Sequence, residues 1–336
     1  MPRPKTILIT GANGEIGHGL VEALSGKPDT RIVALDLRPL DDHLAAKCHA
    51  TVVGDIGDRD LLGRIASEHE IDTVFHLAAL LSTRSERQPL LAHRVNVDGT
   101  LNLLELAIAE ARSQGKDVRF LYPSSIAVYG LPYLDAKRNA GKVCEDDHTR
   151  PTTMYGINKL YCERLGDYYA DHYRQLDQEA TKGGVDFRCI RFPGLISAVT
   201  VPSGGTSDYG AEMLHAAAKG ESYACFVRPD TRIPFMAMPD AVRALLMLEA
   251  APKEALTRRA YNIAAFSPSA EEILAMTLRF FPNAKVSYDP HLKRQGIVDT
   301  WPEDVDDTAA RADWGFHHEF DFERAFADYL IPGLGV

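Results

Sequence analysis

A tyrosine and a lysine four residues apart are the side chains of this sequence best suited to proton transfer. They are Tyr155 and Lys159, in a segment expected to open a long helix. Residues four apart share one face of a helix, so the phenol and the ammonium project into the same space. A nearby cation favours the phenolate, which predicts a general base that works near neutral pH. A solvated tyrosine beside a salt-bridging lysine is the alternative for the pair taken alone.

A glycine-rich turn near the start of the chain predicts a site for a dinucleotide. A β-branched run over residues 5–10 reads as a buried parallel strand, and apolar residues at helical spacing begin at Leu20. Glycines between a strand and a helix aim free backbone N–H groups at an anion and let a pyrophosphate approach closely. A tight turn without a ligand is the alternative. The predicted contacts are Gly11, Asn13, Gly14, Glu15, Ile16 and Gly17.

An acidic residue at the end of the second predicted strand indicates which dinucleotide binds. Asp36 follows the strand over residues 31–35, about 20 residues past the glycines, where a carboxylate accepts hydrogen bonds from the ribose hydroxyls of NAD and repels the 2′-phosphate of NADP. Arg38 is a counter-signal, because an arginine here accepts that phosphate. We predict NAD as the cofactor.

Strands and helices continue to alternate, which predicts an α/β fold with a parallel sheet. After the third strand, Asp55 with Ile56 either reaches the adenine or simply forms a turn. The fourth strand runs into Leu77, Ala78 and Ala79, small enough for a cofactor to pass close to the backbone. Asn96 either braces the active-site backbone or satisfies its own helix. The fifth strand, residues 118–122, ends at Ser124 and Ser125.

Composition excludes several classes of function. The chain has 336 residues, 45% of them apolar, and a formal charge of −10, which argues against nucleic acid or an anionic membrane as a partner. No apolar leader and no run of about 18 apolar residues is present, so we expect an untargeted cytoplasmic protein. Five scattered cysteines without a CxxC pair predict reduced thiols, and no metal site is predicted.

Together these motifs resemble the extended short-chain dehydrogenase/reductase family, in its NAD-dependent epimerase/dehydratase branch. The resemblance is carried by residues 10–17, Asp36, residues 124–130 and residues 155–159. It implies a Rossmann-type doubly wound parallel sheet and a catalytic group made of a serine, the tyrosine and the lysine. Ser125 matches the catalytic serine best, and Ser124 is the neighbour expected to share its work. By the same analogy, Pro193 borders the nicotinamide, although a plain strand end is the alternative.

The resemblance also implies how the chain is divided and assembled. Residues 1–194 are expected to form the NAD-binding Rossmann domain, including the catalytic helix. Residues 195–336 are expected to form a smaller α/β subdomain that binds the substrate, with some segments returning to the Rossmann core. A homodimer through the helices at 95–112 and 154–173 is the family expectation.

Four separated stretches are similar to the short-chain type of L-threonine 3-dehydrogenases within that family: residues 202–209, 239–244, 261–264 and 301–307. The similarity implies oxidation of the threonine 3-hydroxyl to 2-amino-3-oxobutyrate. The small-molecule substrate would then be held by Ser82, Ser125, Thr206 and Ser207, and Trp301 would close the site. A loop serine, a turn-forming Gly-Thr-Ser and a core tryptophan are the alternatives.

Departures from that pattern leave other substrates open. Residues 131–147 and 174–184 are longer than usual, and Ala237 stands where a tyrosine is usual, which would enlarge the site. Other stretches resemble sugar-acid dehydrogenases of the D-erythronate type, and a nucleotide-sugar epimerase or dehydratase is a further alternative. A non-catalytic NAD-binding regulator is the least favoured, because a purely binding role does not need the base.

Overall fold

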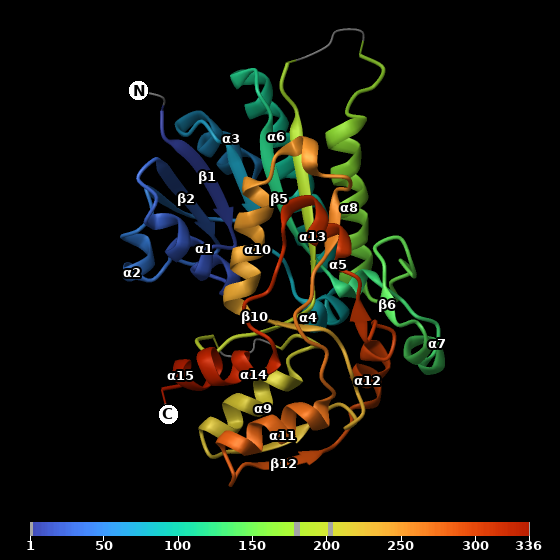
Figure 1. Ribbon diagram of the computed structural model, residues 1–336. Helices are drawn as coiled ribbons and strands as arrows, with labels where there is room; N and C mark the ends of the chain where they lie inside the picture. The colour runs from blue at the N-terminus through green and yellow to red at the C-terminus, as the bar shows by residue number, and fades with distance from the viewer. Residues whose placement is uncertain (1–2, 178–181, 201–203, 336) are drawn as a thin grey trace.

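A seven-stranded parallel sheet forms the centre of the protein, seen in a computed structural model that describes residues 3–177, 182–200 and 204–335 (Figure 1). The strand order is β3-β2-β1-β4-β5-β7-β11, and every neighbouring pair is parallel. The strands are β1 (Lys5–Thr10), β2 (Thr30–Asp36), β3 (Ala50–Val53), β4 (Thr73–His76), β5 (Val118–Ser125), β7 (Val185–Phe192) and β11 (Ala260–Asn262). The predicted Rossmann-type doubly wound fold is confirmed.

The helices either pack against the two faces of this sheet or belong to a smaller region beside it. In the first half of the chain they are α1 (Glu15–Ser25), α2 (Asp42–Ala45), α3 (Arg59–Glu68), α4 (Ser82–Arg87), α5 (Pro89–His93), α6 (Gly99–Gln114), α7 (Leu134–Asn139) and α8 (Met154–Asp171). In the second half they are α9 (Tyr209–Ala218), α10 (Met238–Ala250), α11 (Ala270–Phe280), α12 (Leu292–Val298), α13 (Thr308–Trp314), α14 (Phe322–Arg324) and α15 (Ile331–Gly333).

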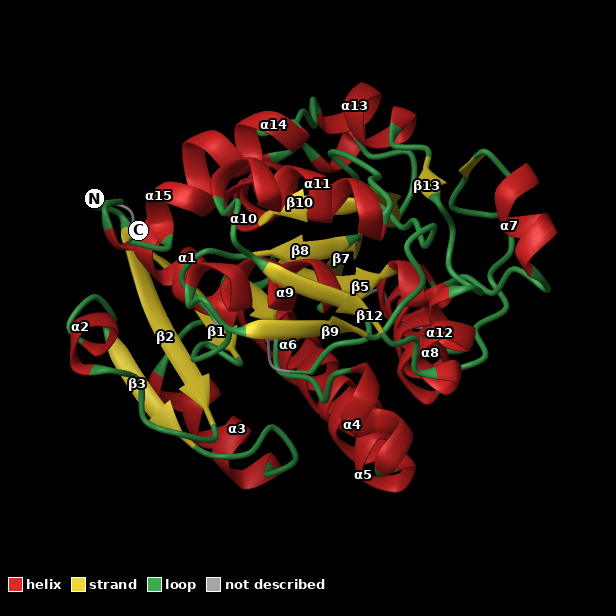
Figure 2. Ribbon diagram, turned by 90° about the horizontal axis from the view of Figure 1, so that it is seen from below, coloured by secondary structure: helices red, strands yellow, loops and turns green. Residues whose placement is uncertain are grey.

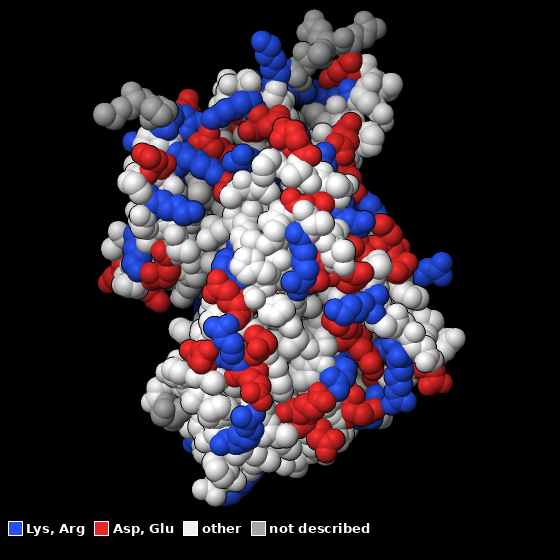
Figure 3. All heavy atoms as spheres, in the orientation of Figure 1, with Lys and Arg blue, Asp and Glu red and all other residues white. Residues whose placement is uncertain are grey.

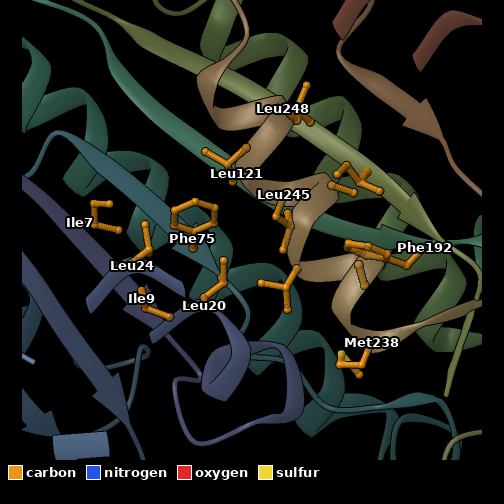
Figure 4. Close-up of a cluster of buried hydrophobic side chains, with 14 of the residues drawn as sticks. Ile7, Ile9, Leu20, Leu24, Phe75, Leu121, Phe192, Met238, Leu245 and Leu248 are labelled. Carbon is orange, nitrogen blue, oxygen red and sulfur yellow. The ribbon is translucent and has the colours of Figure 1, made fainter. Parts of the chain in front are cut away.

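Two apolar layers enclose the sheet. On one face α1 and α10 lie together, and Leu20, Leu24, Leu245 and Leu248 pack against strand residues such as Phe75 (Figure 4). On the other face, residues of α3, α6 and α8 pack in a second cluster, which includes Leu61, Leu104 and Cys162. A strand buried on both faces explains why β1 reads as a nearly continuous apolar and β-branched run, whereas β7, equally buried, contains charged side chains that are paired internally.

The remaining elements form a smaller region beside the carboxyl ends of the sheet strands (Figures 1 and 2). It contains three short parallel pairs, formed by β8 (Gly194–Ile196) with β10 (Phe235–Ala237), β9 (Ser222–Cys225) with β12 (Lys285–Tyr288), and β6 (Lys142–Val143) with β13 (Asp304–Val305). A third apolar cluster joins these pairs to the turn after β5 and to α9 and α11. Strand β11 and helix α10 return to the main sheet from this half of the chain.

Two predicted segments differ in detail. The helix expected over residues 95–112 begins as one π-helical turn, Arg94–Asp98, before α6. The carbonyl of Asn96 in that turn accepts hydrogen bonds from side chains of Thr100 and Cys162, which offer it partners outside the ordinary helical ladder. Pro202 and Ser203 of the expected substrate motif, and residues 178–181 of the expected insertion, lie outside the described residues.

The surface carries charges of both signs. On the face shown in Figure 3, acidic and basic side chains are interspersed over most of the view. Among the described residues, no helix is both long enough and apolar enough to cross a membrane.

Candidate active site

The glycine turn joins β1 to α1 and has room for backbone only. Gly11 has a φ of +67°, and a Cβ there would lie 2.6 Å from the backbone nitrogen of Ala78. A Cβ on Gly17 would lie 2.4 Å from the carbonyl oxygen of Ala12. Helix α1 starts after Gly14 without a side-chain cap, so the first-turn N–H groups keep their capacity for an anion. This turn therefore fits the pyrophosphate of a dinucleotide.

Asp36 lies beside the glycine turn, as the sequence predicts. One carboxylate oxygen accepts a hydrogen bond from the backbone N–H of Asn13 at 3.0 Å, and the other accepts from the N–H of Arg38 at 3.1 Å. The side chain of Asn13 is bound to the carbonyl of Pro39 and to His18. The half-buried carboxylate of Asp36 is thus oriented by the backbone and keeps acceptor capacity for ribose hydroxyls. Arg38 is exposed.

The loops after β3 and β4 contain the other residues predicted to contact the cofactor. Asp55 is exposed and accepts a hydrogen bond from the N–H of Gly57 at 2.8 Å, which is the turn-forming role. Ile56 is buried. The N–H of Leu77 donates to the carbonyl of Thr10, and Ala78 contacts the position of Gly11, so the β4 loop lies against the glycine turn. Ala79 is half-buried in the same loop.

Asn96 braces the backbone of that loop. Its side-chain oxygen accepts from the N–H of Leu80 at 2.7 Å, and its side-chain nitrogen donates to the carbonyl of Leu80 at 3.2 Å. Of the two alternatives left by the sequence, the structure has the bracing one. Both hydrogen bonds are buried, so they fix the path of the chain after β4.

A buried histidine that the sequence argument missed continues this network. His76, at the end of β4, contacts the hydroxyl of Thr10 at 2.8 Å through one ring nitrogen and that of Thr100 at 2.9 Å through the other. Burial lowers the pKa of His76 to about 3, so the ring is neutral. A histidine at the end of an apolar strand, followed by a threonine-bearing helix, was the available signal. The network ties β1, β4 and α6 together beneath the glycine turn.

The predicted base and its lysine lie at the start of α8. Thr153 caps this helix by accepting from the N–H of Gly156 at 3.1 Å. A Cβ at Gly156 would lie 2.0 Å from the carbonyl oxygen of Ala127, so this glycine lets the helix touch the turn that follows Ser125. Tyr155 is half-buried there.

The ammonium of Lys159 is buried beneath Tyr155. Its Nζ donates to the carbonyl of Pro123 at 2.6 Å and lies 4.6 Å from the ring centroid of Tyr122 and 5.5 Å from that of Tyr155. Lys159 is thereby held between strand β5 and the predicted base. The expected shared face of the two side chains is present.

The expected lowering of the tyrosine pKa is not present in the protein alone. Burial raises the pKa of Tyr155 to about 12 and lowers that of Lys159 to about 8. Desolvation, which disfavours the charged form of each group, is the largest cause of both changes.

The two serines after β5 have different roles. Ser125 is half-buried, and its oxygen accepts from the N–H of Ala127 at 3.1 Å, which leaves its hydroxyl hydrogen free to donate. Ser124 is buried and donates to a carboxylate oxygen of Glu163 at 2.5 Å. The hydroxyl of Ser124 is therefore bound to an internal carboxylate, and its share in the catalytic work stays a prediction. The two serines differ because neighbouring residues of a strand point to opposite faces, and Ser124 and Ser125 are consecutive residues of β5.

Ser82 and Thr206, predicted to hold the substrate, are brought together from distant parts of the chain. Both the N–H and the hydroxyl of Thr206 donate to the oxygen of Ser82, at 3.0 Å each. Ser82 begins α4, which packs against α8, and Glu86 of α4 accepts from the N–H of Met154 at 2.6 Å. Ser82 thus lies on a helix that also contacts the start of α8, where the predicted base lies. Ser207 next to it is half-buried.

Trp301 is buried, and its side chain carries one polar atom, the indole nitrogen. Its side chain is 3% exposed and belongs to the same apolar cluster as Ala127, Val128 and, at its edge, Tyr155. Its indole nitrogen, a donor, contacts no acceptor among the described residues, and the expectation that Trp301 closes the site stays a prediction. Pro193 is buried between β7 and β8, at the same sheet edge as Ser125.

Comparisons with known proteins agree with this geometry. The sequence model described as "NAD dependent epimerase/dehydratase family" matches residues 7–264. The mitochondrial L-threonine 3-dehydrogenase of Bos taurus is 36% identical over 327 residues, which cover 96% of this chain and 81% of that protein.

Solved structures give the same result. A partial consensus L-threonine 3-dehydrogenase is 37% identical, with a TM-score of 0.86 over 99% of this chain and 100% of that one. L-threonine dehydrogenase from Phytophthora infestans is also 37% identical, with a TM-score of 0.83 over 98% of each chain.

Proposed function

The chain belongs to the NAD-dependent epimerase/dehydratase family, and from that premise we propose that it oxidises the 3-hydroxyl of L-threonine to 2-amino-3-oxobutyrate. It is an NAD-dependent dehydrogenase acting on a CH–OH group. The observation that carries the threonine proposal is the similarity to proteins named L-threonine 3-dehydrogenase along 96% of the chain. A similarity confined to the residues of the sheet would support binding of the cofactor but not the identity of the substrate.

Residues at the carboxyl ends of the strands would hold the cofactor. The turn from Gly11 to Gly17 would take the pyrophosphate, and Asp36 would take the adenosine ribose. Ile56, the segment from Leu77 to Ala79 and Pro193 would line its remaining length. Bound NAD supplies the hydride acceptor. The preference for NAD over NADP rests on Asp36, whose carboxylate is oriented beside the glycine turn.

Three side chains of this protein would have separate roles in moving the proton of the substrate hydroxyl. Tyr155 accepts the proton of the substrate hydroxyl as the hydride leaves the same carbon, so the alcohol becomes a ketone. The free hydrogen of Ser125 donates to the substrate oxygen and holds it. Lys159 lies below the ring of Tyr155 and stabilises the phenolate once the site is closed to water. Ser82, Thr206 and Ser207 would hold the amine and carboxylate, and Trp301 would shape the wall.

We also propose which part of the chain binds which ligand, and how the subunits assemble. Residues 1–194 would bind NAD, and residues 195–336 would mainly bind substrate. A homodimer through α6 and α8 is supported by exposed apolar side chains: Tyr161 and Ile157 on α8 are 54% and 48% exposed, and Leu101 on α6 is 37% exposed. We place the protein in the cytoplasm, whereas the cattle relative has "mitochondrial" in its name.

A substrate panel tests the proposed reaction. The protein is mixed with NAD and, separately, with L-threonine, L-serine, 3-hydroxybutyrate, D-erythronate and UDP-glucose, and NADH absorbance is followed. L-Threonine should give the highest kcat/KM. A higher kcat/KM with D-erythronate would show that the substrate is a sugar acid and not threonine. Binding of NAD without turnover of any of these compounds would favour a non-catalytic NAD-binding regulator.

A further inference from the structure

An ion pair is buried beneath the proposed base. Arg191 of β7 and Glu163 of α8 are each 2% exposed. Their side chains form two parallel hydrogen bonds, Nη2 to Oε2 at 2.6 Å and Nε to Oε1 at 3.0 Å. Such a bidentate pair is geometrically specific, and it persists in a core only where further hydrogen bonds satisfy it.

The pair is connected to Lys159 by two short paths. Along α8, Glu163 lies four residues after Lys159 and therefore on the same face. Across to β5, Glu163 accepts from the hydroxyl of Ser124, and the preceding residue, Pro123, accepts from the ammonium of Lys159. We infer that Glu163 and Arg191 are positioning residues that hold the Lys159 ammonium at the end of β5, and that their opposite charges cancel each other beside it.

Few titratable groups besides Glu163 face the ammonium of Lys159. From α8 they are Tyr155, Cys162 and Glu163, from β5 Tyr122, from β7 Cys189, and from β4 the neutral His76. Burial lowers the pKa of Lys159, and the two thiols and Glu163 oppose that change. Burial also raises the pKa of both thiols, and Glu163 is the carboxyl group among the described side chains named here.

The same pair reaches the long segment over residues 131–147. Nη1 of Arg191 donates to the hydroxyl of Tyr129 at 2.9 Å and to the carbonyl of Glu145 at 2.5 Å. The carboxylate of Glu145 accepts from the N–H of Asn262 at 3.0 Å. The end of this segment is thus bound to β7 and β11, and Arg191 joins it to the catalytic helix.

The test measures the protonation of Lys159 directly, in protein without added nucleotide or substrate. Lysines labelled with ¹³C at Cε are titrated by NMR, and the Lys159 signal is assigned as the one lost in Lys159→Met. Glu163→Gln leaves the Arg191 cation unbalanced and should move the Lys159 midpoint down by about one pH unit. Arg191→Met leaves the carboxylate unbalanced and should move it up by about the same amount. The double variant should return close to the wild type.

Matched controls separate charge from general loosening of the core. Asp186→Asn neutralises another buried arginine-paired carboxylate on β7, held to Arg188 at 2.6 Å, and should leave the Lys159 midpoint unchanged. The signal of Lys137, whose pKa burial also lowers to about 8, serves as an internal reference that should not move. If Glu163→Gln does not fold, the direction in which Arg191→Met moves the Lys159 midpoint still tests the inference.

Equal midpoints in all folded variants, or shifts of one sign in both single variants, would overturn the inference. The inference rests on the proposed role of Lys159, but the titration needs no substrate. A correct charge response with no threonine oxidation would therefore reject only the proposed substrate.

Discussion

The oxygen of Ser82 accepts hydrogen bonds from both the N–H and the hydroxyl of Thr206, across 124 residues of chain. One residue begins a helix beside the sheet, and the other lies in the loop before α9. Both side chains are buried, so the pair fastens the smaller region to the edge of the sheet where the proposed base lies.

Ser82→Ala should weaken both this junction and substrate binding. It leaves two buried donors of Thr206 without an acceptor, which costs about 1–3 kcal/mol of unfolding free energy. KM for threonine should rise about tenfold, with a smaller change in kcat. Urea unfolding and steady-state kinetics measure the two effects. Ser67→Ala, which removes a hydroxyl bound only to its own helix, is the control, and an unchanged KM in Ser82→Ala would exclude this pair from the substrate site.

Tyr155→Phe should stop turnover while cofactor binding persists. The change removes the proposed base and keeps the ring, so kcat should fall about a thousandfold. Quenching of protein fluorescence by NADH measures binding separately. Tyr161→Phe alters an exposed tyrosine on the same helix and should leave kcat unchanged. Full activity in Tyr155→Phe would place the base on another residue.

Asp36→Ala should narrow the preference for NAD over NADP. The carboxylate that repels a 2′-phosphate is lost, together with its hydrogen bonds from Asn13 and Arg38. The ratio of kcat/KM for NAD to that for NADP should fall by about ten- to a hundredfold. Asp41→Asn, at an exposed position nearby, is the control. A ratio that does not change would remove Asp36 from cofactor selection.

Acidification should destabilise the protein partly through His76. Its pKa of about 3 in the folded state lies below the ordinary value of 6.5, so the unfolded chain binds more protons between these values. Stability from this group is complete above pH 6.5 and is lost as the pH falls toward 3. Between about pH 7 and pH 5 the wild type should lose about 2 kcal/mol more than His76→Asn. Urea unfolding at both pH values measures this, and parallel losses would show that His76 is not buried as a neutral ring.

Substitutions on the exposed face of α8 should separate the subunits of the proposed dimer. Ile157→Asp places a charge in an apolar contact, and light scattering after size exclusion should report a monomer. Leu278→Asp, on α11 and also exposed, should not change the mass. A monomeric wild type would reject the dimer itself.

The local parts of the site were predictable from the sequence. The strand over residues 5–10, the glycine turn and Asp36 follow from short-range patterns, and the shared helical face of Tyr155 and Lys159 follows from their spacing. Each depends on the geometry of one element or of one strand–turn–helix unit. The parallel sheet followed because alternating strands and helices allow few other arrangements.

Tertiary structure alone decided how the remaining side chains are used. Ser124 and Ser125 are adjacent in the sequence, but only the packing of α8 against β5 directs one of them to Glu163. The pairing of Glu163 with Arg191, and the burial that raises the pKa of Tyr155, likewise arise where separate elements meet. Hydrogen-bond partners and desolvation depend on atoms distant in the chain, and the spacing of residues along a sequence does not contain them.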